Sequence, residues 1–277
     1  MPLDLTIAIP VRNEEKCLLA CLDAIGKDFA ARVVVLDSQS NDKTPELARQ
    51  WGANVFDFHW NGLFPKKRNW FLRNHPPSTS WVLFLDADEI LTPTFKDELS
   101  RVLPTSKLNG YWLRYSIYFM GRELRFGYPL KKLALFRVGC GEYERIAEGN
   151  WTKMDMEIHE HPQIEGELGE IKAKIDHRDF HGIAHYVAKH NEYSTWEAHR
   201  FTQMTGSANQ ENVQLTWKQK LKYRIAGTPL AGIIYFIGAY VFMGGFLDGV
   251  RGLTFAILKM SYFTQVYCKV QELKGQK

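Results

Sequence analysis

The chain has 277 residues, with 35 lysines and arginines against 31 acidic residues, which gives a formal net charge of +4. Apolar residues make up 45% and charged residues 24%, so a disordered, collagen-like or fully membrane-embedded chain is excluded. The charge is too small to indicate a nucleic-acid partner. The four cysteines form no CxxC or zinc spacing, and the N-terminus lacks the pattern of a signal peptide, so we expect a reducing, cytoplasmic environment.

Short apolar runs alternate with segments of helical spacing along the first 90 residues. We predict strands at residues 5–11, 32–37, 51–58 and 80–86, and helices at residues 13–25, 42–51 and 65–74. This alternation is typical of βαβ units that form a mostly parallel sheet. After residue 109 the pattern changes, and two further strands are predicted at residues 110–119 and 131–137.

Acidic residues stand where the predicted strands end. Asp37 closes one strand, and Asp86 and Asp88 follow another within the sequence FLDADE. In α/β sheets of this kind, ligands bind at the carboxyl ends of the strands. Two carboxylates at this spacing could hold Mg²⁺ or Mn²⁺ on a diphosphate. Acids that only make a strand end soluble are the alternative.

Two further segments could contact a nucleotide. Ser38, Ser40 and Asp42 follow Asp37 in a turn-forming stretch, where they could meet a base or ribose, although Asp42 could simply cap the next helix. Lys66, Lys67 and Arg68 open a predicted helix. Cations at a helix N-terminus work against its dipole, so a bound anion such as a diphosphate would explain them.

Four segments, in this order and spacing, resemble glycosyltransferase family 2 with a GT-A fold: IAIPVRNEE, VVVLDSQSNDKT, PKKRN and FLDADE. Three later segments resemble the branch typified by bacterial lipopolysaccharide-core β-1,4-glucosyltransferases: IHE at residues 158–160, HRDFHGIAHYVAKHNEYSTWEA at residues 177–198, and YVFMGGFLDGVRG at residues 240–252. The fold expected from the resemblance is a Rossmann-like, nucleotide-sugar-binding sheet flanked by helices, with a C-terminal helical appendage.

The resemblance implies a role for each matching residue. Pro10 and Glu14 would lie in the nucleotide-binding first loop, Asp37 would contact the uracil or its ribose with Ser40 in the same loop, and Arg68 would lie beside the nucleotide. Asp86 would face the ribose and the metal, and Asp88 would ligate the metal. His177 is a candidate for a further metal or diphosphate contact, with an ordinary polar role as the alternative.

The expected reaction is inverting transfer of one hexose from a nucleotide sugar, such as UDP-glucose, to a glycolipid or lipid-linked saccharide. No QxxRW motif is present, which disfavours processive synthesis. The acceptor hydroxyl needs a carboxylate as general base. Glu160 is the preferred candidate, with Asp155 and Glu157 as alternatives. A polyisoprenyl-phosphate glycosyltransferase, which needs no such base, is the competing enzyme, and a non-catalytic sugar- or membrane-binding scaffold is the competing class.

The C-terminal part combines basic and apolar residues. Residues 228–247 carry no charge and are long enough to cross a bilayer, but their glycines weaken a straight helix. Lys218, Lys220, Lys222 and Arg224 precede them. We expect peripheral or monotopic attachment to lipids on the cytoplasmic side of the inner membrane, with a spanning helix and a core or oligomer interface as alternatives. The expected domains are therefore a catalytic domain at 1–205 and a membrane-associating helical region at 206–277.

Overall fold

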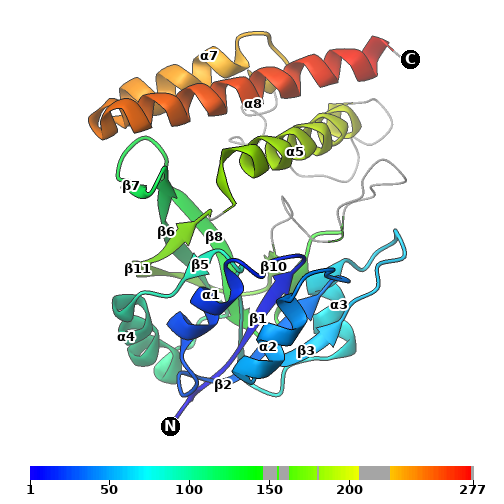
Figure 1. Cartoon of the computed structure of the whole chain (residues 1–277), viewed down its shortest axis with the longest axis vertical. Helices are drawn as coiled ribbons and strands as arrows, with labels where there is room; N and C mark the ends of the chain where they lie inside the picture. Colours follow the sequence, from blue (N-terminus) through cyan, green and yellow to red (C-terminus); the bar gives the residue numbers. More distant parts are fainter. Residues whose placement is uncertain (146–154, 156–161, 180, 206–224, 276–277) are drawn as a thin grey trace. The chain divides into compact units, whose positions relative to one another are not determined.

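The computed structural model describes residues 1–145, 155, 162–179, 181–205 and 225–275 (Figure 1). The chain divides into two compact units. The N-terminal unit comprises Met1–Ile117 and Pro129–Phe180, and the C-terminal unit comprises Tyr118–Tyr128 and His181–Lys277. The hairpin at residues 118–128 therefore leaves the first unit in mid-chain and becomes part of the second.

A mixed sheet forms the centre of the N-terminal unit. Its strands, in the order in which they neighbour one another, are β3 (Asn54–Asp57), β2 (Ala30–Asp37), β1 (Leu3–Val11), β4 (Trp81–Phe84), β8 (Leu130–Arg137), β6 (Gly110–Phe119), β11 (Leu168–Arg178) and β5 (Glu89–Ile90). β7 (Arg122–Leu124) pairs with β6, and β9 (Gly141–Tyr143) pairs with β10 (Pro162–Ile164) in a separate ribbon. β3, β2, β1 and β4 are parallel, whereas β8 runs antiparallel to both β4 and β6.

Short helices connect the parallel strands. They are α1 (Leu18–Ile25), α2 (Thr44–Trp51) and α3 (Lys67–Asn74). A fourth helix, α4 (Pro93–Val102), follows β5 and continues into η1 (Leu103–Thr105) before β6. A helix must return the chain between parallel strands, and this is why the helical spacing in the sequence falls between the apolar runs. The predicted α/β fold, with helices flanking the sheet and a helical C-terminal part, is confirmed. The sheet is mixed and not mostly parallel, because β8 runs antiparallel to β4 and β6, and β5 runs antiparallel to β11.

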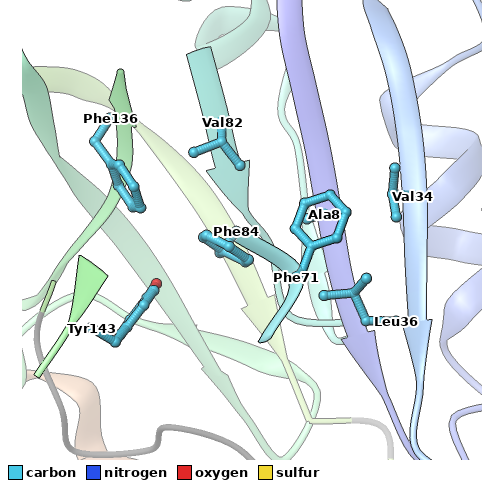
Figure 2. Packing of buried hydrophobic residues seen from close by; sticks show 8 residues of the cluster. All are labelled: Ala8, Val34, Leu36, Phe71, Val82, Phe84, Phe136 and Tyr143. Carbon is cyan, nitrogen blue, oxygen red and sulfur yellow. The ribbon is translucent and has the colours of Figure 1, made fainter. Parts of the chain in front are cut away.

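One face of the sheet packs against α3. Ala8, Val34, Leu36, Val82, Phe84 and Phe136 point to the same side, and Phe71 of α3 lies over them (Figure 2). Phe71 and Phe84 meet edge-on with ring centroids 6.4 Å apart. Because side chains alternate along a strand, the intervening residues Ile7, Ile9 and Val35 face the other side, where they are also buried. Both faces are covered, which explains the continuous apolar runs of these strands.

Helices dominate the C-terminal unit. They are α5 (Gly182–Thr205), α7 (Ala231–Phe236), the π-helical η2 (Ile237–Phe242), the 3₁₀ turn η3 (Gly245–Asp248) and α8 (Gly249–Gly275). The core between α5 and α8 contains Ala198, Phe201, Tyr262, Val266 and Val270. α5 thus belongs with the C-terminal helices, whereas the sequence placed residues 182–205 in the catalytic domain.

The predicted apolar segment at residues 228–247 is broken in the structure. Within the described part of the chain, no single helix is long and apolar enough to cross a membrane. One pair of helices, Ala231–Phe242 and Gly245–Gly275, has the required length and composition only when taken together, and it is bent by 74°. Gly244, at the break, has a φ of +76°, a conformation that glycine adopts without strain.

Candidate active site

The acids predicted from the sequence lie along one edge of the sheet. β1 pairs in parallel register with β2 and β4, and Val11 at the end of β1 stands opposite Asp37 at the end of β2. Asp86 and Asp88 follow the end of β4 on the other side of β1. Because β1, β2 and β4 run parallel, their carboxyl ends lie at the same edge of the sheet. The three acids that follow β2 and β4 therefore lie at this edge. This is the edge at which α/β sheets bind ligands.

The first and second loops at this edge are joined by hydrogen bonds. The Asn13 amide donates to Ser40 Oγ at 2.9 Å, and the Asn41 amide donates to the Asn13 side chain at 2.8 Å. The Glu14 amide donates to Thr44 Oγ1 at 2.8 Å. Pro10, buried in β1, precedes this arrangement. The loop after β1 is thereby held against the loop after β2, as a binding site for one shared ligand requires.

Asp37 organises the second loop. Its side chain is buried and accepts hydrogen bonds from the Ser40 hydroxyl at 2.5 Å and from the Ser40 amide at 3.1 Å. Beside it, the buried hydroxyl of Ser38 has no hydrogen-bond partner among the residues that the structure describes. A buried hydroxyl without a partner is costly. This edge of the site therefore holds a polar group that a ligand could satisfy.

A chain of opposite charges runs through Asp86. Its carboxylate accepts from Arg68 Nη2 and from Lys132 Nζ, each at 2.8 Å. Lys132 Nζ also donates to Glu89 Oε1 at 2.5 Å, and Glu89 is fully buried. Four side chains from α3, the loop after β4, β8 and β5 thus alternate in sign, which fixes the Asp86 carboxylate in place.

Burial and charge shift the pKa values in this chain of residues. Burial raises the pKa of Glu89 to about 7 against the attraction of Lys132, and the neighbouring Asp86 contributes to the rise. Burial alone would lower the pKa of Lys132, but the charges of Asp86 and Glu89 outweigh it and raise that pKa well above its usual value. Lys132 therefore stays cationic at neutral pH, and its charge is balanced within the site.

Asp88 faces His177 across the paired strands β5 and β11. His177 lies opposite Glu89 in the antiparallel register, and the Arg178 amide donates to the Asp88 carbonyl oxygen at 2.8 Å. These contacts bring His177 Nε2 to 3.3 Å from Asp88 Oδ2. Burial lowers the pKa of His177, but the Asp88 carboxylate outweighs this effect, so the net shift is upward. The structure thus brings together two residues that lie 89 positions apart and that the sequence analysis assigned to a metal.

The cations at the start of α3 have partners within the protein. Lys67 is buried, and its ammonium donates to the Val11 carbonyl oxygen at 2.9 Å and lies 3.5 Å from Asp155 Oδ2. Burial lowers the pKa of Lys67 against the attraction of Asp155. Arg68 pairs with Asp86. For Lys67 and Arg68, a bound anion is therefore not needed as an explanation, because Asp155 and Asp86 already balance their charges.

Most of the predicted site residues fall into two groups in the structure. Pro10, Glu14, Asp37 and Ser40 belong to the two joined loops, and Arg68, Asp86, Asp88 and His177 surround the end of β4. Glu160 and Glu157 lie outside the described residues, as do the basic residues at 218–224. Asp155 is among the described residues, and its carboxylate balances the positive charge of Lys67. The choice of general base stays a prediction.

Sequence reasoning missed Lys132 and Glu89 as parts of this site. Glu89 is in the FLDADE motif, but only Asp86 and Asp88 of that motif were given a role, and Lys132 is in the sequence KKLALFR of a predicted strand. A signal was present, because a lysine beside buried apolar positions of a central strand needs a partner. The identity of that partner depends on the pairing of β4 with β8, which only the structure shows.

Comparisons with known proteins agree with this geometry. The family model "Glycosyl transferase family 2" matches residues 6–129, which include both joined loops and the acids after β4. This segment of the chain is therefore similar to family 2 glycosyltransferases.

Individual relatives match parts of the chain. A TPR repeat-containing protein of Synechococcus elongatus is 35% identical over 86 residues, covering 31% of this chain and 21% of its own length. The 4,4'-diaponeurosporenoate glycosyltransferase of Staphylococcus haemolyticus is 33% identical over 89 residues, covering 30% of this chain and 24% of its own length. The chain thus spans about a fifth to a quarter of these relatives.

A solved structure of glucosyl-3-phosphoglycerate synthase from Mycobacterium tuberculosis, in complex with Mn²⁺, UDP and glucosyl-3-phosphoglycerate, matches with a TM-score of 0.33 and 24% identity. The match covers 41% of this chain and 44% of that chain.

Proposed function

We propose that this protein is an inverting glycosyltransferase that moves one hexose from a nucleotide sugar to a hydroxyl group of a glycolipid or lipid-linked saccharide. The observation that carries the proposal is the grouping of Asp37, Asp86 and Asp88 at one edge of the parallel strands, inside the segment that matches the family 2 model. A UDP-hexose such as UDP-glucose is the proposed donor. The likeness to the lipopolysaccharide-core branch in the late segments supports the lipid-borne acceptor.

The two joined loops would bind the nucleoside. Asp37 is held by Ser40 with its carboxylate at the strand edge, and the unpartnered hydroxyl of Ser38 lies in the same loop. Both groups suit the hydroxyls and imide of a uridine. Because these contacts exist before and during the reaction, they contribute to binding of the donor rather than to the chemical step.

Asp88 and His177 would hold a divalent cation. A carboxylate and an imidazole within 3.3 Å of each other form a donor set that accepts Mn²⁺ more readily than the oxygen-seeking Mg²⁺. When bound, such a cation neutralises negative charge on the departing diphosphate. Both oxygens of Asp86 already contact cationic side chains, so Asp86 would serve to orient the ribose and the adjacent loop.

The chemical step requires a base for the acceptor hydroxyl. Glu160 is the proposed base, with Glu157 as its alternative, and Asp155 is disfavoured by its contact with the Lys67 ammonium. Loss of a general base slows transfer by about 10²- to 10⁴-fold. Glu160→Gln should therefore bind the donor normally and lose transfer.

A donor screen tests the function directly. The purified full-length chain is incubated with UDP-, GDP- and dTDP-hexoses and Mn²⁺ or Mg²⁺, and release of the nucleoside diphosphate is measured with and without lipid extracts as the acceptor source. We expect UDP release that lipid extract stimulates. Binding of UDP-hexose without release under every condition would favour the non-catalytic scaffold.

A further inference from the structure

The bend between α7 and α8 leaves a concentration of large apolar side chains uncovered. Phe242 and Val250 are 83% and 79% exposed, and Met243, Phe246 and Leu247 are about half exposed. Farther along α8, Phe255, Tyr262 and Val266 are buried. Exposed apolar side chains also occur along α7 and η2, at Ile233, Ile234, Ile237 and Val241, so the apolar surface extends from these helices to the bend.

The hairpin at residues 118–128 is fixed to this bend. The amides of Arg125 and Phe126 donate to the Asp248 carboxylate at 3.1 and 3.0 Å, and the Gly127 amide donates to the Met243 carbonyl oxygen at 3.0 Å. The backbones are so close that a Cβ added at Gly127 would lie 2.8 Å from Gly245 Cα. The hairpin and the bend therefore form one built surface, drawn from segments more than 110 residues apart.

The hairpin adds positive charge to the apolar surface. Arg122 and Arg125 are both exposed, and Phe126 is partly exposed beside Gly244. Asp248 is engaged by the hairpin amides, and Glu123 lies 3.9 Å from Arg125. We call the set Phe126, Phe242, Met243, Phe246, Leu247 and Val250, with Arg122 and Arg125, the elbow surface.

We propose that the elbow surface inserts into the interface of an anionic lipid bilayer. Aromatic and aliphatic side chains next to arginines are the combination that binds at the headgroup level of anionic membranes. The bent pair also has the length and composition of a broken or re-entrant apolar segment. A second copy of the chain fits less well, because a two-fold interface uses the same patch twice and would bring the same arginines together.

Flotation with vesicles tests the proposal. The full-length chain is mixed with vesicles of phosphatidylcholine alone or of phosphatidylcholine with one quarter phosphatidylglycerol. We expect it to float with the mixed vesicles and to bind the neutral ones more weakly. Phe242→Ser/Leu247→Ser should lower binding to the mixed vesicles by at least about tenfold, since it removes two inserted side chains. Arg122→Gln/Arg125→Gln should lower binding to the mixed vesicles by about fivefold for each arginine removed.

Matched controls separate the surface from general effects. Leu63→Ser removes an exposed leucine of the N-terminal unit, and Arg101→Gln/Lys107→Gln removes two exposed cations there; both should float like the wild type. Circular dichroism confirms that each variant is folded. Release of UDP from a soluble donor should be unchanged in the elbow variants, so a failure of this proposal is distinct from a failure of the proposed function.

Two results would overturn the proposal. One is flotation of the Phe242→Ser/Leu247→Ser variant equal to that of the wild type. The other is a wild-type chain that ignores both kinds of vesicle and sediments as a dimer that the same variant converts to a monomer, which would assign the surface to a second copy.

Discussion

At the scale of single residues, the site depends on carboxylates whose partners come from distant parts of the chain. Asp37 is held by its own loop, Asp86 by two cations, and Asp88 by a histidine from β11. The same type of side chain therefore has three environments within one site. Each environment predicts a different consequence of mutation.

Asp37→Ala should weaken the donor without slowing the chemical step. A charged hydrogen bond to the nucleoside is made equally in the ground state and the transition state, so its loss raises KM and leaves kcat nearly unchanged. We expect KM for the donor to rise by about 10- to 100-fold. Asp57→Ala is the matched control, because Asp57 stands opposite Asp37 at the end of β3 and is exposed. An unchanged KM in Asp37→Ala would reject the assignment.

Lys132→Met should destabilise the N-terminal unit, because it leaves the buried Glu89 without its cation. Breaking a buried ion pair by removing one partner costs about 3–5 kcal/mol of unfolding free energy, whereas replacing both partners costs much less. Denaturant unfolding of Lys132→Met, Glu89→Gln and the double variant measures this coupling. The double variant should be more stable than Lys132→Met. Additive losses would show that the two side chains do not act as a pair.

At the scale of elements, a glycine of the hairpin at residues 118–128 allows its close approach to the α7–α8 bend. Gly127 and Gly121 have the same φ of +74°, but only Gly127 has backbone atoms within 3 Å of the place where a Cβ would stand. A comparison of substitutions at these two positions therefore separates the effect of backbone strain from the effect of close packing.

Gly127→Ala should destabilise the C-terminal unit more than Gly121→Ala does. Both substitutions carry the strain of a positive φ, and Gly127→Ala adds overpacking against Gly245 and the Ala239 carbonyl, which costs about 1–3 kcal/mol more. Chemical unfolding followed by circular dichroism measures the difference. Equal losses at the two positions would show that the hairpin is not packed on the bend.

The elements differ in how well their sequences predicted them. β1, β2 and β4 were predicted because strands buried on both faces read as continuous apolar runs. β11 was not predicted, although Ile171, Ala173 and Ile175 in its sequence LGEIKAKIDHR alternate with polar residues as in a half-buried strand. The acids at the strand ends were predicted because they stand where these apolar runs end. The second cation that pairs with Asp86 was not, because Lys132 reaches Asp86 through the pairing of β4 with β8, which short-range patterns do not encode.

At the scale of the whole molecule, the chain combines a segment that matches the family 2 glycosyltransferase model, residues 6–129, with a helical unit that has an exposed apolar and basic surface. The two units carry separate proposed tasks, transfer of a hexose and contact with a bilayer. The hairpin at residues 118–128 belongs to the second unit, although the residues that flank it in the chain belong to the first. Each task is testable without the other.

The central claim is that the acids at the sheet edge make this chain a metal-assisted glycosyltransferase, and Asp88 tests it most directly. The measurement is UDP release from a UDP-hexose by the wild type with Mn²⁺, by the wild type in excess EDTA, and by Asp88→Asn, with Asp57→Asn as the exposed control at a neighbouring strand end. We predict release by the wild type and the control, and a loss of at least about 10²-fold in EDTA and in Asp88→Asn. Release that is unchanged in Asp88→Asn and in EDTA would contradict the account.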